Sequence, residues 1–239
     1  MNIQANDPKL KRKYNRFLEN YGSNYDEEMY AFIYSYFGEE IDSLGTVYPL
    51  MEIYSELGVY GKEDFYLQHV NLIKENFDIS GNILEVGAGC FPAFGKKMAI
   101  EQLKIKSGTI TLYDRDLAIK KPLTKNMRLV KDSFSSATDI KSYDLIVGIM
   151  PCEATRIIIE RACEERKDFY IALCDCVNDP VLLARDPFLR MKRPEDYHQM
   201  IFRIAEEFLD EYDNGYLQIE YMDSKYDQDA PIIYNKRKR

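Results

Sequence analysis

The residues with the clearest chemical use lie in one short segment, ILEVGAGCFPAFG at positions 83–95. An apolar run there ends in Glu85, and Gly87 and Gly89 follow it. Glycines allow the backbone to reverse sharply and allow a ligand to approach the main chain closely. A helix that begins behind such a turn offers free backbone N–H groups to a carboxylate or a phosphate. The residues expected to bind a ligand here are Glu85, Gly87, Ala88 and Gly89. A plain strand–helix turn has the same spacing and is the competing interpretation.

Acidic residues also follow the next two apolar segments of the chain. Asp114 comes directly after the β-branched and aromatic run that ends at position 113, and Asp116 is its close rival. A carboxylate there can accept hydrogen bonds from both hydroxyls of a ribose. Asp132, with Ser133 beside it, follows the third apolar segment and can accept a hydrogen bond from an adenine amino group. A single acidic residue after a strand is more often a solvent-facing cap. Three acidic strand ends in succession, after a glycine turn, favour a ligand site.

The elements that must position these residues alternate between strand and helix from residue 82 onward. Strands are predicted at residues 83–86, 109–113, 127–130, 145–149 and 169–174, with helices at 94–103 and 154–165. This alternation predicts parallel strands joined by crossover helices. A helix at 194–212 and an antiparallel strand pair at 216–222 and 231–234 follow. The predicted fold class is α/β: a doubly wound, seven-stranded, mostly parallel sheet with an antiparallel last strand pair, preceded by an N-terminal helical cap.

The first 80 residues differ from the rest in charge and composition. They hold 7 Lys and Arg, 14 Asp and Glu, and 10 of the 19 tyrosines, whereas the remaining residues hold 25 basic and 26 acidic side chains. Apolar residues recur at helical spacing in this part, so we predict a helical cap over 1–80 and a ligand-binding domain over 81–239. Tyrosine rings and carboxylates in such a cap suit a cationic or amine ligand. The side chains in question are Tyr25, Tyr30, Tyr34, Tyr36, Asp26, Glu27 and Glu28. A tyrosine core under a solvated acidic face explains the same pattern.

The composition excludes several classes of protein. Of the 239 residues, 46% are apolar and 30% are charged, which excludes a disordered chain and a disulfide miniprotein. The net charge of −8 disfavours nucleic acid as a partner. No apolar run approaches the roughly 20 residues needed to span a bilayer, and the start lacks the features of a secretory signal. The five cysteines indicate reduced thiols, so we expect a cytoplasmic protein with no membrane partner. The sequence does not indicate an oligomeric state.

Together, these motifs resemble the class I S-adenosylmethionine-dependent methyltransferases, a Rossmann-like superfamily, over about residues 82–176. The resemblance is carried by Glu85, Gly87, Gly89, Asp114, Asp132 and the predicted fourth strand at 143–147. In that family the glycine turn holds the methionine part of S-adenosyl-L-methionine, and the acids after strands two and three hold the ribose and the adenine. The resemblance implies these roles for the matching residues, with S-adenosyl-L-methionine as cofactor. Nucleotide-binding dehydrogenases are disfavoured, because residues 90–92 are Cys-Phe-Pro where those enzymes carry a third glycine.

Residues 148–153, GIMPCE, follow the fourth predicted strand. In this fold the acceptor meets the methyl group there. The resemblance places Gly148 and Met150 beside the cofactor, and Cys152 and Glu153 on the acceptor side. We expect Glu153 to act as a base or to orient the acceptor. The expected function is methyl transfer to a small-molecule acceptor, and the charge distribution favours an acceptor that bears an amine.

Three alternative functions remain open. Pyrimidine C5 methyltransferases carry Pro-Cys where Pro151 and Cys152 lie, and RNA members carry a cysteine after strand five, where Cys174 and Cys176 lie. The glycine turn also matches the short G-x-G-x-x-P pattern of nicotianamine synthases, which transfer an aminocarboxypropyl group. A protein that binds S-adenosylmethionine without catalysis is the third alternative.

Four cysteines follow predicted strands one, four and five, so they can share one rim of the sheet: Cys90, Cys152, Cys174 and Cys176. Clusters of thiolates bind zinc or iron–sulfur centres. No pair has the Cys-x-x-Cys spacing, and the chain has only two histidines. The sequence therefore predicts no metal, with the cysteines as small residues of the crevice. His69 and His198 lie in predicted helices and are expected to be structural.

Overall fold

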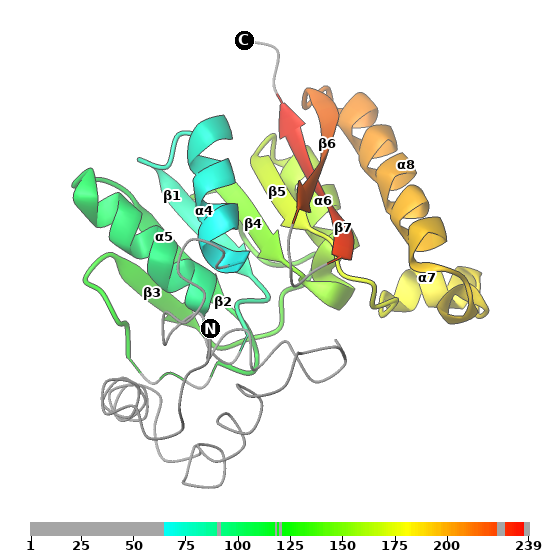
Figure 1. Ribbon diagram of the computed structural model, residues 1–239, viewed down its shortest axis with the longest axis horizontal. Helices are drawn as coiled ribbons and strands as arrows, with labels where there is room; N and C mark the ends of the chain where they lie inside the picture. Colours follow the sequence, from blue (N-terminus) through cyan, green and yellow to red (C-terminus); the bar gives the residue numbers. More distant parts are fainter. Residues whose placement is uncertain (1–64, 90–91, 118, 120, 224–227, 237–239) are drawn as a thin grey trace, which may run out of the picture.

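The computed structural model describes residues 65–89, 92–117, 119, 121–223 and 228–236, which form one seven-stranded sheet with helices on both faces (Figure 1). The strands are β1 (Asn82–Val86), β2 (Thr109–Tyr113), β3 (Met127–Val130), β4 (Leu145–Ile149), β5 (Asp168–Ala172), β6 (Tyr216–Asp223) and β7 (Gln228–Lys236). Their order in the sheet is β3-β2-β1-β4-β5-β7-β6. Strands β1 to β5 are parallel, and β7 runs antiparallel to both β5 and β6. The predicted α/β fold class, with its antiparallel last pair, is confirmed.

The central strands are apolar along their whole length because both faces of the sheet are covered. All five residues of β4 are buried, as are four of the five in β1. Strands buried on both faces have continuous apolar runs rather than alternating ones. Glu85 in β1 is the exception: this acidic residue has only 2% of its surface exposed. A carboxylate that is buried in a central strand indicates a polar function at this position of the sheet.

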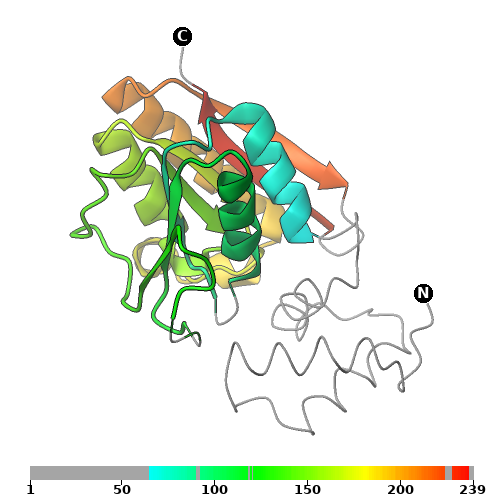
Figure 2. The same cartoon turned by 90° about the vertical axis from the view of Figure 1, so that its left-hand side faces the viewer.

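Two helix pairs cover the two faces, as Figure 2 shows from the side. The helices α4 (Phe65–Asn76) and α5 (Ala93–Lys104) share one apolar core with the sheet. On the opposite face, α6 (Thr155–Glu164) and α8 (Pro194–Tyr212) form a second core. The connection β1–α5–β2 therefore runs over one face and β4–α6–β5 over the other. This change of face at the centre of the sheet is where open α/β folds form a crevice.

Some short elements differ from those expected. Strand five was predicted to reach residue 174 but ends at Ala172, and the last strand is longer than predicted. The helix α7 (Pro180–Arg185) was not predicted; Asp179 caps it by accepting hydrogen bonds from the N–H groups of Val181 and Leu182. Two 3-10 turns, η3 (Cys152–Ala154) and η4 (Leu189–Met191), were also missed. Short elements of this kind lack the periodicity on which the predictions rest.

Residues 65–80, which contain helix α4, are the described part of the predicted cap. Val70 and Ile73 of α4 are fully buried in the core that this helix shares with α5. The other predicted cap residues, 1–64, with the seven tyrosine and acidic side chains named above, lie outside the described residues. The division into 1–80 and 81–239 therefore stays a prediction. None of the helices in the described ranges is long and apolar enough to cross a membrane.

Candidate functional site

A cavity of about 650 Å³ lies at the carboxyl ends of strands β1 to β4. The position follows from the topology, because β1 pairs with β2 on one side and with β4 on the other. Small-molecule sites are typically about 300–1,000 Å³. Every residue predicted for the site lines this cavity except Gly148. The lining also includes residues that were not predicted from the sequence, among them Tyr66, Arg115 and Phe134.

The glycine turn between β1 and α5 is held close to its neighbours on both sides. Gly87 and Gly89 have φ of 72° and 73°, in the left-handed region that favours glycine. The N–H of Gly87 donates to the carbonyl of Tyr113 in β2 at 3.0 Å. On the other side, a Cβ added to Gly87 would lie 3.1 Å from Cα of Pro151. The turn therefore has glycines where its backbone geometry and close packing require them.

Glu85 lies behind this turn, at the base of the cavity. Its side chain has space because residue 95 is a glycine: a Cβ there would lie 2.3 Å from Oε2 of Glu85. Helix α5 begins at Ala93 without a side-chain cap. Uncapped first-turn N–H groups can be satisfied by a ligand. A carboxylate and a helix start thus lie together, and they suit the ammonium and carboxylate groups of an amino acid.

Asp114 both organises the turn and faces the cavity. Oδ2 of Asp114 accepts a hydrogen bond from the N–H of Gly89 at 2.9 Å, and Oδ1 accepts one from the N–H of Asp116 at 2.7 Å. A carboxylate offers about four acceptor positions, so positions remain for a ligand hydroxyl. Asp116 is exposed and forms an ion pair with Nε of Arg115 at 3.2 Å.

The end of β3 adds a polar and an aromatic group. Oδ1 of Asp132 accepts a hydrogen bond from the N–H of Ser133 at 2.8 Å, and both residues are exposed. Phe134 packs edge-on against Tyr113, with ring centroids 5.7 Å apart. Aromatic rings beside a carboxylate suit a flat, amino-bearing base. A lone aromatic residue in the polar stretch 131–139 was the signal that could have identified Phe134.

Arg115 and Glu153 link the loop after β2 to η3. Nη1 of Arg115 lies 2.7 Å from Oε1 of Glu153, and both side chains are more than half exposed. Both residues line the cavity. The ion pair orients the Glu153 carboxylate through Oε1 and leaves its second oxygen for another partner. The sequence analysis selected Glu153 but not the arginine that holds it.

The segment after β4 is strained. Met150 and Cys152, on either side of Pro151, have φ of 54° and 46°, which is uncommon for residues other than glycine. Met150 and Pro151 line the cavity. Gly148 is buried beneath them: a Cβ there would lie 2.7 Å from Cγ of Pro151. Gly148 therefore supports the wall of the site from behind rather than lining it.

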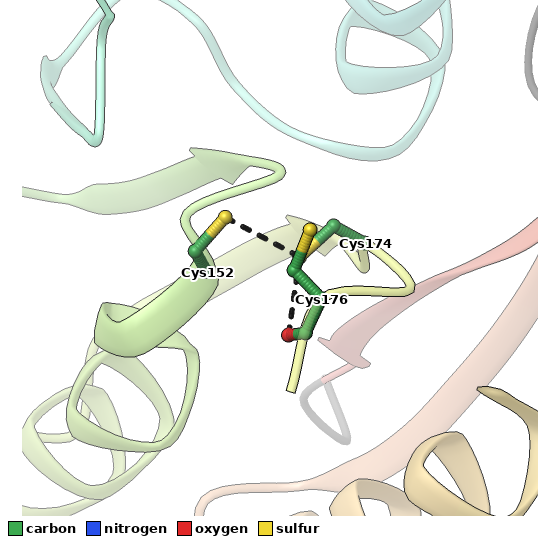
Figure 3. Close-up of side chains that lie close together, drawn as sticks. All are labelled: Cys152, Cys174 and Cys176. Atoms are coloured by element: carbon green, nitrogen blue, oxygen red, sulfur yellow. Dashed lines mark hydrogen bonds between the residues drawn. The ribbon is translucent and has the colours of Figure 1, made fainter. Parts of the chain in front are cut away.

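Three of the four rim cysteines come together, as Figure 3 shows. Sγ of Cys174 lies 3.5 Å from Sγ of Cys152, and Sγ of Cys176 is within 4.8 Å of both. The thiol of Cys174 donates a hydrogen bond that lowers the pKa of Cys152, and the same bond raises the pKa of Cys174 to about 12. Cys90, the fourth of this set, lies outside the described residues.

The two histidines are structural in position, as expected. His69 is buried, and its Nδ1 lies 2.7 Å from the hydroxyl of Tyr170 in β5. Burial lowers the pKa of His69 to about 3. Nε2 of His198 lies 3.4 Å from the carbonyl oxygen of Cys174, and neither histidine lines the cavity.

Comparisons with known proteins show similarity in fold. No family model and no curated protein sequence matches the chain. Human N-acetylserotonin methyltransferase in complex with SAM is 12% identical, with a TM-score of 0.40 over 96% of this chain and 67% of that chain. The CMeT domain of the citrinin polyketide synthase is 12% identical, with a TM-score of 0.47 over 96% and 79%. At this identity and TM-score, the likeness assigns neither a ligand nor a reaction. The sheet order β3-β2-β1-β4-β5-β7-β6 and the position of the cavity at the strand ends are therefore described from the structure itself.

Proposed function

We propose that this chain is an S-adenosylmethionine-dependent methyltransferase that acts on a small molecule. One observation carries the proposal. Glu85, Asp114 and Asp132, at the ends of three adjacent strands, line one cavity of about 650 Å³ around the glycine turn. A site of this size fits a nucleoside with an amino-acid chain better than it fits a macromolecule.

The residues present fit the cofactor part by part. Gly87 and Gly89 line the cavity without side chains, so a ligand can approach the main chain closely there. Asp114 keeps acceptor positions for ribose hydroxyls, and Asp132 lies near the aromatic ring of Phe134 for an adenine. When bound, S-adenosylmethionine supplies a methyl group on a sulfonium, which a nucleophile displaces in line.

The protein groups on the other side of the cavity would align the acceptor. Alignment and exclusion of water are the main contributions that a protein makes to such a displacement. Met150 and Cys152 line the wall at the end of β4, and Glu153 follows them. Because Arg115 holds Oε1 of Glu153, Oε2 is placed to orient an acceptor group or to accept its proton.

The charges of the cavity support an acceptor that bears an amine. Its described lining includes five acidic residues and a single basic one, Arg115. The acidic side chains are Glu85, Asp114, Asp116, Asp132 and Glu153. A cationic ligand is attracted to such a lining and an anionic one is repelled.

Titration calorimetry with S-adenosylmethionine and S-adenosylhomocysteine tests this function, with NAD⁺ as the control ligand. We expect both sulfur ligands to bind and NAD⁺ not to bind. Failure of both sulfur ligands to bind would overturn the proposal. Mass spectrometry of reactions with a panel of amines then follows formation of S-adenosylhomocysteine and the methylated product.

Three further outcomes would support the alternative functions. None of these functions is favoured by a contact among the residues that the structure describes. Binding without any product would support the non-catalytic protein. Release of methylthioadenosine instead of S-adenosylhomocysteine would support aminocarboxypropyl transfer. A covalent adduct of Cys152 with RNA that contains 5-fluorocytosine would support the pyrimidine methyltransferase.

A further inference from the structure

Three thiols converge on one wall of the cavity from two separate loops (Figure 3). Cys152 begins η3 after β4, whereas Cys174 and Cys176 follow β5. All three line the cavity, and their sulfur atoms lie within 4.8 Å of one another. Cys163 differs from them: it belongs to α6 and is fully buried in the core that this helix shares with the sheet, as expected of a cysteine that only packs.

The backbone is strained where it brings Cys152 into this cluster. Strands β4 and β5 pair up to Ile149 and Ala172, so the segments that follow them leave the sheet side by side. Cys152 has φ of 46°, a left-handed conformation that is unfavourable for a residue other than glycine. Backbone strain of this kind persists where the surrounding structure enforces it, and strained residues are common at functional sites.

We propose that Cys152, Cys174 and Cys176 bind a zinc ion at the acceptor side of the cavity. Tetrahedral zinc with Zn–S bonds of about 2.3 Å requires sulfur atoms roughly 3.8 Å apart. The Cys152–Cys174 separation is 3.5 Å and no separation exceeds 4.8 Å, so small side-chain rotations produce the required set.

Three protein ligands leave one coordination position. Within the described ranges, no fourth histidine, cysteine, aspartate or glutamate joins the group. Among the described residues this position is open to the cavity, which can supply water or the acceptor itself. Three protein ligands with an open position are typical of catalytic rather than structural zinc sites. A thiol or amine that took this position would lose its proton more readily.

This site goes beyond the proposed methyl transfer and departs from the expectation that the chain binds no metal. That expectation rested on the missing Cys-x-x-Cys spacing and on the presence of only two histidines, whereas this site combines Cys152 from one loop with Cys174 and Cys176 from another. A pair of neighbouring strand ends supplies these ligands. The thiols do not require S-adenosylmethionine in order to bind a metal, so the zinc site and the cofactor site can be tested separately.

Zinc binding is measured on the full chain after removal of any affinity tag, reduction and treatment with a chelator. A chromophoric chelator competes for Zn²⁺, and Cd²⁺ provides an independent signal through thiolate-to-metal absorption. We expect about one Zn²⁺ per chain. Substitution of a second-sphere residue weakens a metal site by about 10–100-fold, so loss of a ligand in Cys152→Ser or Cys176→Ser should weaken it at least ~100-fold. The matched control, Cys163→Ala, should keep the affinity of the unmodified chain.

Cys176 is exposed, so Cys176→Ser tests the site without disturbing the core. Circular dichroism confirms that each variant is folded. Equal zinc affinity in Cys176→Ser and the unmodified chain would overturn the proposal. A Cys152–Cys174 disulfide in protein purified without reductant, together with no zinc binding after reduction, would also overturn it in favour of a redox pair. Neither result would affect the calorimetric test of cofactor binding.

Discussion

The carboxylate of Asp114 accepts a hydrogen bond from the backbone N–H of Gly89, with an N···O distance of 2.9 Å. This bond joins the turn after β1 to the end of β2. The sequence analysis gave Asp114 one role, as a ribose ligand. The structure adds a second role, because the same side chain holds the glycine turn and the following backbone at Asp116. Loss of Asp114 should therefore affect the shape of the site as well as its contacts.

Asp114→Ala should lower both stability and cofactor affinity. Hydrogen bonds to charged groups contribute about 1.5–3 kcal/mol each, and Asp114 accepts two, so we expect the free energy of unfolding to fall by roughly 3 kcal/mol. Affinity for S-adenosylmethionine should fall by at least about tenfold. Denaturant unfolding and calorimetry measure the two effects. Asp139→Ala is the matched control, because Asp139 also accepts a backbone N–H in a turn but lies outside the cavity. Unchanged cofactor affinity in Asp114→Ala would contradict the assigned role.

Gly87→Ala should weaken ligand binding through the backbone. Alanine at φ of 72° costs about 1–2 kcal/mol, and its Cβ would press against Pro151 at 3.1 Å. We expect lower stability together with weaker binding of S-adenosylhomocysteine, measured by thermal unfolding with and without ligand. Gly215→Ala has a similar backbone penalty, at φ of 94°, away from the cavity. Gly215→Ala should unfold at a lower temperature, but the ligand should raise its unfolding temperature as much as it does in the unmodified chain.

Glu153→Gln should slow turnover while cofactor binding is unchanged. A positioned general base contributes about 10²–10⁴-fold, and glutamine keeps the shape of the side chain without its charge. We expect kcat to fall by about 100-fold. Glu164→Gln is the control, since Glu164 pairs with Arg161 on α6, outside the site. If Glu153→Gln turned over normally, Glu153 would be only the ion-pair partner of Arg115.

His69 should make stability depend on pH below neutrality. Burial lowers its pKa to about 3 in the folded chain, whereas an exposed histidine has a pKa of about 6.5. Between these values the unfolded state takes up a proton that the folded state excludes, so stability falls as the pH falls. The slope approaches about 1.4 kcal/mol per pH unit, and the effect is absent well above pH 6.5.

Urea unfolding between about pH 5 and 6.5, above the range of most carboxylates, measures this slope. His69→Gln should reduce this slope by up to the contribution of one proton, about 1.4 kcal/mol per pH unit. The comparison variant His198→Gln leaves His69 in place and should keep that part of the slope. An identical pH dependence in His69→Gln and the unmodified chain would contradict the burial of a neutral ring.

The regular elements could be predicted because their signals are local. Strands β2, β3 and β4 lie at their predicted positions, since each is a short apolar run between polar residues. Helix α8 also has its predicted bounds, with Pro194 at its start. The acids after β2 and β3 could be placed on one edge as well, because parallel strands end on the same side of a sheet.

The contacts between loops could not be predicted in this way. Arg115 and Glu153 are 38 residues apart and meet only because β1 lies between β2 and β4. Cys152 meets the thiol of Cys174 because β4 and β5 pair in parallel and the chain after β4 takes a left-handed conformation. The spacing of residues in the sequence indicates neither the order of the strands nor the backbone conformation after β4.

By itself, the sequence determined where the first four strands end and which residues can turn sharply, because apolar patterning and glycine act over a few residues. Only the tertiary structure decided which strand ends face one another. Strand order depends on long-range packing of two helix pairs against opposite faces of the sheet. For this reason the glycine turn, its acids and the shared rim of the cysteines could be predicted from the sequence, whereas the ion pair and the contact between the thiols could not.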